Sequence, residues 1–275
     1  MLALIINLAA AADRLALQMA QLKQLALPFE RIEAVTPATL SPPADDPMWH
    51  RWQRPLRATE MALLASHVRA WQRVMRLARP ALVLEDDALL AASVPAFLET
   101  VAALAGIDHI TLETRGRKKL VARDRDPRAA MRRLWQDRTG SAAYVVWPSG
   151  AAKLLRAANA HAGPSDAVIS SAGGLVSYQA DPALAIQLDQ CAAYGVKQLL
   201  ATASSVDAVP KPQAVSEAYS IHARVAFRAR RVAAQVRMGW RQARHPFAVE
   251  RRPIQPAADW PDLRLLPVSA PAALR

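Results

Sequence analysis

Ala81-Leu82-Val83-Leu84-Glu85-Asp86-Asp87 is an apolar run that ends in three consecutive acids. A short run of Leu and Val predicts a buried strand of a parallel sheet, and ligands of open α/β sheets bind at the carboxyl ends of such strands. We therefore expect Glu85, Asp86 and Asp87 at the edge of a ligand site. Adjacent carboxylates repel one another unless a cation neutralises them, and Mn²⁺ or Mg²⁺ often bridges such oxygens to a phosphate. The alternative is that the acids cap the following segment, since Asp and Glu favour helix N-termini and turns.

Strand and helix patterns alternate on both sides of this run. Residues 2–8, 13–25 and 29–35 predict a strand, a helix and a second strand, which gives parallel pairing with a right-handed crossover. A loop rich in Pro, Asp and Trp should cover 36–55, and Thr59 should cap the helix that follows it. The other expected elements are a helix at 94–105, a strand at 109–112, a charged mobile or substrate-side loop at 115–133, a strand at 141–147 and a helix at 149–158. The order predicts an α/β protein with a mostly parallel sheet flanked by helices.

Composition limits the class of protein. With 275 residues, 52% of them hydrophobic, the chain can bury a sizeable core. The single Cys191 excludes an intramolecular disulfide partner and a Cys-rich zinc site, so we expect a cytoplasmic protein. The apolar N-terminus has no basic region before it and predicts a strand rather than a signal peptide. No run approaches the roughly 20 apolar residues of a spanning helix.

The C-terminal part differs in character. We place a boundary near residue 205, with a main domain at 1–205 and a Pro-containing linker and basic, partly helical segment at 206–275. The net charge of +12 and the pI near 10.7 favour an anionic partner. One helical face carries Val225, Val232, Val236 and Trp240, with Arg224, Arg228, Arg231 and Arg241 as charged neighbours. This pattern suits the inner face of an anionic membrane, and the alternative is a helix packed on the main domain. Nucleic acid is not expected, because no binding motif or aromatic platform accompanies the arginines.

An ordered set of motifs runs through the first two thirds of the chain. The motifs are Ile6-Asn7-Leu8, Leu27-Pro28-Phe29-Glu30-Arg31, Glu60, Ser66-His67-Val68-Arg69-Ala70-Trp71, the acid run, Leu112-Glu113-Thr114, Thr139-Gly140-Ser141-Ala142-Ala143-Tyr144, Gly150-Ala151 and Leu154-Leu155. In this order they resemble glycosyltransferase family 25, which contains bacterial lipopolysaccharide glycosyltransferases and collagen galactosyltransferases. The resemblance covers roughly residues 1–190.

The resemblance implies a GT-A-like fold, a UDP-sugar donor, often UDP-galactose, and a divalent metal, with inversion at the anomeric carbon. The acceptor would be a lipid-linked saccharide of the cell envelope. The acid run would replace the DxD-type motif, whose Mn²⁺ or Mg²⁺ stabilises the leaving UDP. We expect Asp87 and Asp86 as metal ligands, with Glu85 the more structural member.

Inversion also needs a carboxylate that takes the proton of the acceptor hydroxyl. Asp166 lies where similar proteins carry an acid after the Gly-Ala helix, and we expect it on a loop. Glu113 is the rival base because it also ends a strand at the same sheet edge. Capping explains Asp166 as well as catalysis does.

Further residues are implied to bind substrate. His67 belongs to the Ser66-His67 motif near the donor, although a lone helical His is usually structural, and Glu60 lies on the same helix. Asn7, at the end of the first strand, and Arg14 would approach the nucleotide. The remaining candidates, for a donor or acceptor wall, are Thr139, Gly140 and Tyr144.

Two departures from the family pattern affect this interpretation. Ala9-Ala10 stands where Asp-Arg usually follows the first strand, and Ala62-Leu63 replaces the usual Gly-Cys. The alternatives to an active enzyme are therefore a catalytically silent relative that binds nucleotide or glycan, and a basic adaptor for membrane or nucleic acid.

Overall fold

The protein is described here by a computed structural model covering residues 1–137, 140–200, 221–243 and 248–261. A mixed sheet has the strand order β11-β6-β7-β9-β5-β8-β3-β1-β2, and β10 pairs with β4 in a second small sheet. The strands are β1 (Leu2–Asn7), β2 (Phe29–Glu33), β3 (Ala81–Glu85), β4 (Ala88–Leu90), β5 (His109–Thr111), β6 (Lys119–Ala122), β7 (Met131–Gln136), β8 (Ala143–Val146), β9 (Ser177–Ala180), β10 (Ala185–Gln187) and β11 (Val249–Arg252).

The N-terminal half of the sheet has the expected parallel pairing. β1 pairs in parallel with β2 and with β3, and β5 pairs in parallel with β9. β8 lies antiparallel between β3 and β5, which makes the whole sheet mixed. The carboxyl ends of β1 and β3 therefore meet at one edge, and the acid run lies at that edge of the sheet.

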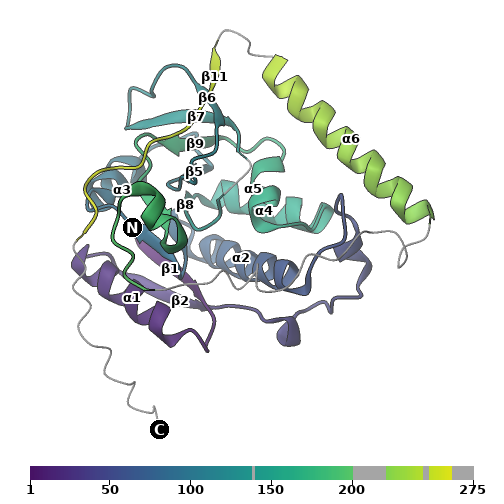
Figure 1. The fold of residues 1–275 in the computed structure, drawn as a ribbon, viewed down its shortest axis with the longest axis horizontal. Helices are drawn as coiled ribbons and strands as arrows, with labels where there is room; N and C mark the ends of the chain where they lie inside the picture. Colours follow the sequence, from purple (N-terminus) through teal and green to yellow (C-terminus); the bar gives the residue numbers. More distant parts are fainter. Residues whose placement is uncertain (138–139, 201–220, 244–247, 262–275) are drawn as a thin grey trace.

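Helices cover both faces of the sheet (Figure 1). They are α1 (Ala12–Gln24), α2 (Ala58–Leu77), α3 (Val94–Ala102), α4 (Pro148–Ala160), α5 (Ser165–Ser171) and α6 (Ile221–Ala243), with short 3₁₀ turns at Pro37–Thr39, Pro47–His50 and Leu188–Tyr194. α1 and α3 pack on the face that carries Leu82 and Leu84. α2, α4 and α5 pack on the opposite face, which carries Ala81 and Val83. The α/β class is thus confirmed.

The start of α2 corrects one prediction. The helix begins at Ala58, and Arg57 holds the capping position before it. The carboxylate of Glu60 accepts the backbone N–H of Arg57 at 2.9 Å, as an acid at the third helical position can do. Thr59 therefore lies inside the helix rather than at its cap.

The segment 115–133 is not a loop throughout, because β6 and the start of β7 lie within it. Its charges are tolerated in a sheet because they are paired. Lys119 is 1% exposed and contacts the Glu113 carbonyl at 2.9 Å and Asp137 at 2.6 Å. Arg132 is held by Asp181 at 2.5 Å.

The C-terminal segment returns to the main sheet. β11 pairs antiparallel with β6, although it comes from beyond the predicted boundary. That boundary, near residue 205, lies outside the described residues, as do Thr139 and the side chains of Trp240 and Arg241. In the ranges that the structure describes, no helix has the length and apolar character needed to cross a membrane.

Candidate active site

The three consecutive acids point in different directions because side chains alternate along a strand. Glu85 follows Ala81 and Val83 and faces α2, whereas Asp86 faces α1 on the other side of the sheet. Asp86 and Asp87 together form the turn between β3 and β4. The three consecutive acids thus place their carboxylates in three different surroundings.

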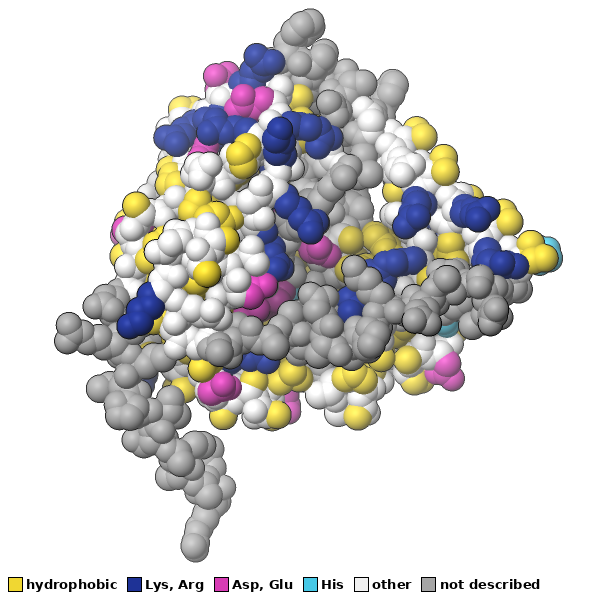
Figure 2. Space-filling model, in the orientation of Figure 1, with side chains coloured by type: hydrophobic (Ala, Val, Ile, Leu, Met, Phe, Trp, Pro, Cys, Tyr) yellow, Lys and Arg dark blue, Asp and Glu magenta, His cyan; other side chains and the backbone are white. Residues whose placement is uncertain are grey.

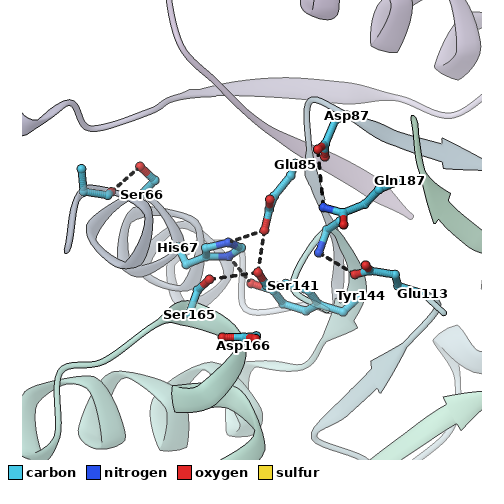
Figure 3. Close-up of polar contacts among 12 residues, drawn as sticks. Ser66, His67, Glu85, Asp87, Glu113, Ser141, Tyr144, Ser165, Asp166 and Gln187 are labelled. Atoms are coloured by element: carbon cyan, nitrogen blue, oxygen red, sulfur yellow. Dashed lines mark hydrogen bonds and ion pairs between the residues drawn. The ribbon is translucent and has the colours of Figure 1, made fainter. Parts of the chain in front are cut away.

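Glu85 is the centre of a hydrogen-bonded network on the α2 face (Figure 3). It accepts a hydrogen bond from Ser141 Oγ at 2.5 Å and lies 3.2 Å from His67 Nε2. Ser141 Oγ is in turn 2.9 Å from Ser165 Oγ at the start of α5. Burial raises the pKa of Glu85, but the hydrogen bond with His67 and that from Ser141 outweigh it, so the pKa lies below its ordinary value. Glu85 is held as a carboxylate.

The neighbours of His67 determine which of its ring nitrogens carries the hydrogen. Trp71 Nε1 donates to the Tyr144 hydroxyl oxygen at 2.8 Å, so that hydroxyl can donate its own proton to His67 Nδ1, also at 2.8 Å. Nε2 then carries the hydrogen that faces Glu85. His67 and Tyr144, both predicted from the sequence, are therefore fully buried parts of the scaffold behind Glu85.

Asp86 connects the first strand to the first helix. Its two oxygens accept hydrogen bonds from Asn7 Nδ2 at 2.8 Å and Arg14 Nη1 at 3.0 Å. Asn7 also accepts a hydrogen bond from Arg31 Nε at 3.0 Å. Burial raises the pKa of Asp86, and Arg14 opposes that shift. The structure brings the predicted residues Asn7, Arg14 and Asp86 together. Their polar groups bind one another, so Asn7 and Arg14 are engaged with Asp86.

Glu60 and Ser66 lie apart from the network. Glu60 forms a two-point ion pair with Arg54, at 2.7 and 2.8 Å, in addition to its contact at the helix start. Ser66 Oγ accepts the Val35 N–H and donates to the Ala62 carbonyl, each at 2.8 Å. Figure 3 shows Ser66 on the side of α2 away from Glu85. Both predicted residues hold loop segments against α2.

Three of the buried oxygens that lack a hydrogen-bond partner in the described structure lie near this sheet edge. They are Asp87 Oδ1, Glu113 Oε1 and Gln187 Oε1. The other oxygen of Asp87 receives a long hydrogen bond of 3.4 Å from Gln187 Nε2. Burial, followed by the charge of Glu85, raises the pKa of Asp87 to about 7 and that of Glu113 to about 8. The charge of Arg14 opposes the shift at Asp87, and the charges of Lys119 and Arg115 oppose the shift at Glu113, but they do not cancel the raised pKa values.

Gly140 is required beside Glu113. Its φ of +105° is unfavourable for other residues, and a Cβ placed there would lie 2.6 Å from Glu113 Oε2. The same Glu113 oxygen accepts the Ala142 N–H at 2.9 Å. Gly140 thus lets the chain pass directly over the predicted carboxylate.

Asp166 lies in the first turn of α5, not on the loop predicted for it. One of its oxygens accepts the Ala167 N–H at 2.7 Å, and burial followed by the charge of Glu85 raises its pKa. With Gly140 it lines a cavity of about 500 Å³ between α5 and the sheet. His109 and Thr111 line the same cavity, and His109 Nδ1 and Thr111 Oγ1 are buried without a hydrogen-bond partner among the described residues.

These residues do not form a protein-only metal cage. In the described ranges, no group of three or more His, Cys, Asp or Glu side chains could hold an ion. They do fit an ion shared with a ligand, because Mg²⁺ and Mn²⁺ need only one or two carboxylates when a phosphate supplies other oxygens. Asp87, with one buried oxygen free, fits this role best, and Asp86 fits it less well.

Sequence reasoning missed Ser141, Ser165 and Gln187 as site residues. Ser141 directly follows Gly140 and Ser165 directly precedes Asp166, so their positions in these motifs were the available signal. Gln187 ends β10, a hundred residues after Asp87, and no local pattern marks it.

Comparison with known proteins adds to this geometry. The model of glycosyltransferase family 25 (LPS biosynthesis protein) matches residues 1–169 of the 275. This range holds Asn7, the acid run, Glu113 and Asp166, and it ends before β9 and α6. No curated protein matches the chain.

Proposed function

The chain belongs to glycosyltransferase family 25, whose members are described as LPS biosynthesis proteins, and on that premise we propose its reaction. It transfers a hexose, in the first instance galactose, from a UDP-sugar to a saccharide hydroxyl of a cell-envelope glycolipid, with inversion at the anomeric carbon. The observation that carries the proposal is the set of unpartnered buried oxygens on Asp87, Glu113 and Gln187 beside the ionised Glu85.

The donor diphosphate binds at the Asp87 end of this edge. A UDP-sugar brings further negative charge to an edge where the nearby cations do not cancel the raised pKa values of the carboxyl groups, so we expect a divalent cation to accompany it. Asp87 would hold that cation, and Glu85 would contribute its negative charge from the α2 side. When bound, the cation would neutralise the charge that develops on the leaving UDP.

Asp166 is the general base. An attacking hydroxyl needs space for the rest of its sugar, and Asp166 lines the cavity of about 500 Å³ whereas Glu113 lies beneath Gly140. Glu113, with a pKa of about 8, holds a proton at neutral pH in the absence of a cation. Asp166 removes the proton of the acceptor hydroxyl. At the same time the hydroxyl oxygen forms the new bond to the anomeric carbon, and the bond from that carbon to UDP breaks.

The acceptor sugar occupies the cavity beside Asp166. The Nδ1 atom of His109 and the hydroxyl of Thr111 provide polar atoms that a saccharide can satisfy. The cavity volume falls within the range of pockets for small ligands. The network from Ser165 to Glu85 fixes α5 relative to β3, and so sets the position of Asp166 relative to the donor site.

The test is UDP release from a panel of UDP-sugars with and without Mn²⁺. Asp87→Asn keeps the side-chain shape and removes the charge. The matched control is Asp45→Asn, which makes the same change at an exposed position in the loop before α2. We expect turnover that requires Mn²⁺ and is lost in the first variant but retained in the second. UDP binding is measured by calorimetry in the same samples, because an enzyme without its acceptor can bind and yet turn over slowly.

A silent relative is the second candidate, and one observation favours it. Arg14, which could contact phosphate in the absence of the usual Asp-Arg pair, is engaged with Asp86, and Ala9 and Ala10 offer no polar side chain. Metal-dependent UDP binding without turnover, after acceptors have been screened, would support this candidate. Absence of both binding and turnover would contradict both.

A further inference from the structure

α6, labelled in Figure 1, carries exposed apolar side chains (Figure 2). The apolar stripe consists of Ile221, Val225, Val232 and Val236, whose exposed fractions are 57–68%. They are separated by four, seven and four residues, so on a helix of 3.6 residues per turn they fall within about 60° of one another. Four β-branched residues in one exposed row are unusual on a protein surface, where apolar residues normally occur singly.

The opposite face of α6 packs on the main domain. Phe227 is 6% exposed, and Arg230 donates hydrogen bonds to the backbone carbonyls of His50 and Trp52 at 2.9 and 3.3 Å. Ala234 lies on this side and lines a cavity of about 560 Å³ with Trp52. The helix is therefore held by its other face, and the stripe is not the surface that packs on the domain.

Arginines flank the stripe. Arg224, Arg228 and Arg231 lie along one side of it, and Figure 2 shows basic and hydrophobic side chains next to each other on α6. An acidic residue is absent from the whole of Ile221–Ala243. A row of apolar side chains beside a row of cations matches a bilayer surface, where acyl chains lie directly beneath anionic headgroups.

We propose that this face of α6 binds the surface of an anionic lipid bilayer. The stripe enters the boundary between headgroups and acyl chains, and the three arginines contact the lipid phosphates. The net charge of +12 attracts the whole protein to the same surface. The cavity beneath α6 shares Gln136, Asp137 and Ser170 with the cavity beside Asp166, so this orientation places the proposed acceptor site next to the membrane.

The test is sedimentation of the full chain with vesicles of phosphatidylcholine that contain about a third phosphatidylglycerol, compared with phosphatidylcholine alone. We expect binding only to the anionic vesicles, weakened by salt. The triple change Val225→Gln, Val232→Gln and Val236→Gln should weaken binding about tenfold or more because it removes the buried apolar area. Circular dichroism checks that α6 remains helical.

A charge-matched pair of variants separates α6 from the overall charge. Replacing Arg224, Arg228 and Arg231 by Gln should weaken binding about a hundredfold, since each cation near the surface contributes separately. The control removes the same charge from exposed positions elsewhere, Arg76, Arg79 and Arg117, and should leave binding within about threefold of the unchanged protein.

Three results would overturn the proposal. They are absence of binding to anionic vesicles, equal binding by the triple-valine variant, and equal weakening by both arginine variants. Light scattering adds a further check: a dimer that the valine changes dissociate, in a protein without vesicle affinity, would assign the stripe to a second copy of the chain. Neither measurement depends on UDP turnover, so the outcome is independent of the proposed reaction.

Discussion

Replacing His109 by Gln should make the stability of the protein less sensitive to acid. His109 is 3% exposed, packs 5.3 Å from the ring of Tyr144, and has a buried Nδ1 without a partner in the described structure. Burial, followed by the charge of Lys119, lowers its pKa to about 3. The folded protein therefore keeps this ring neutral at pH values where the unfolded chain protonates it.

The sign and the size follow from proton linkage. Between pH 6.5 and pH 3 the unfolded chain binds one more proton at His109 than the folded protein does, so the free energy of unfolding falls as the pH falls. Each pH unit in this range corresponds to about 1.4 kcal/mol. From pH 7 to pH 5, His109 alone should therefore remove about 2 kcal/mol of stability.

The assay is urea unfolding, followed by tryptophan fluorescence, at pH 7 and pH 5. Buried carboxylates also contribute to the pH dependence, but their contribution is common to the original protein and to His109→Gln. The variant should lose about 2 kcal/mol less than the original protein between the two pH values, whatever its stability at pH 7. His222→Gln, at an exposed position on α6, should leave the loss unchanged. Equal losses in the original protein and in His109→Gln would refute the reasoning.

Three further substitutions test the packing around the site by urea unfolding. Gly140→Ala should cost about 1–3 kcal/mol, because its φ is +105° and its new Cβ would lie 2.6 Å from Glu113; an unchanged midpoint would show that the carboxylate moves freely. Gly150→Ala should cost at least about 3 kcal/mol, since its Cβ would lie 2.0 Å from the backbone oxygen of Asp108, and full stability would contradict the close approach of α4. Tyr144→Phe should cost about 1–3 kcal/mol, because it leaves its buried histidine and tryptophan neighbours without their hydroxyl partner; a smaller loss would mean that they find other partners.

The framework of this fold follows from local patterns. The βαβ opening, the buried strand Ala81–Glu85 and helix α2 each bury an apolar face that the sequence marks, so their existence was predictable. Strands β6 and β7 were missed because their charged residues predict exposure. Lys119 is buried only because Asp137 and the Glu113 carbonyl neutralise and solvate it, and those partners come from elsewhere in the fold.

The candidate site shows a different limit. Treating the three acids as one cluster ignored the alternation of side chains along β3, which sends Glu85 and Asp86 to opposite faces. The partners of each acid lie far along the chain: His67 and Ser141 for Glu85, and Arg14 for Asp86. Such partners depend on how helices pack across a sheet, which a single sequence does not specify.

The opposite placement of Glu85 and Asp86 restricts the backbone of the turn at Asp87. Glu85 is fixed from the α2 side by Ser141, and Asp86 is fixed from the α1 side by Asn7 and Arg14, so the backbone between them has little freedom. Asp87 comes next and cannot turn away to find a better partner, which leaves its Oδ1 buried and without a hydrogen bond in the described structure. A buried unpaired oxygen costs about 1–3 kcal/mol, and a cation bound at Asp87, as proposed above, would remove this cost.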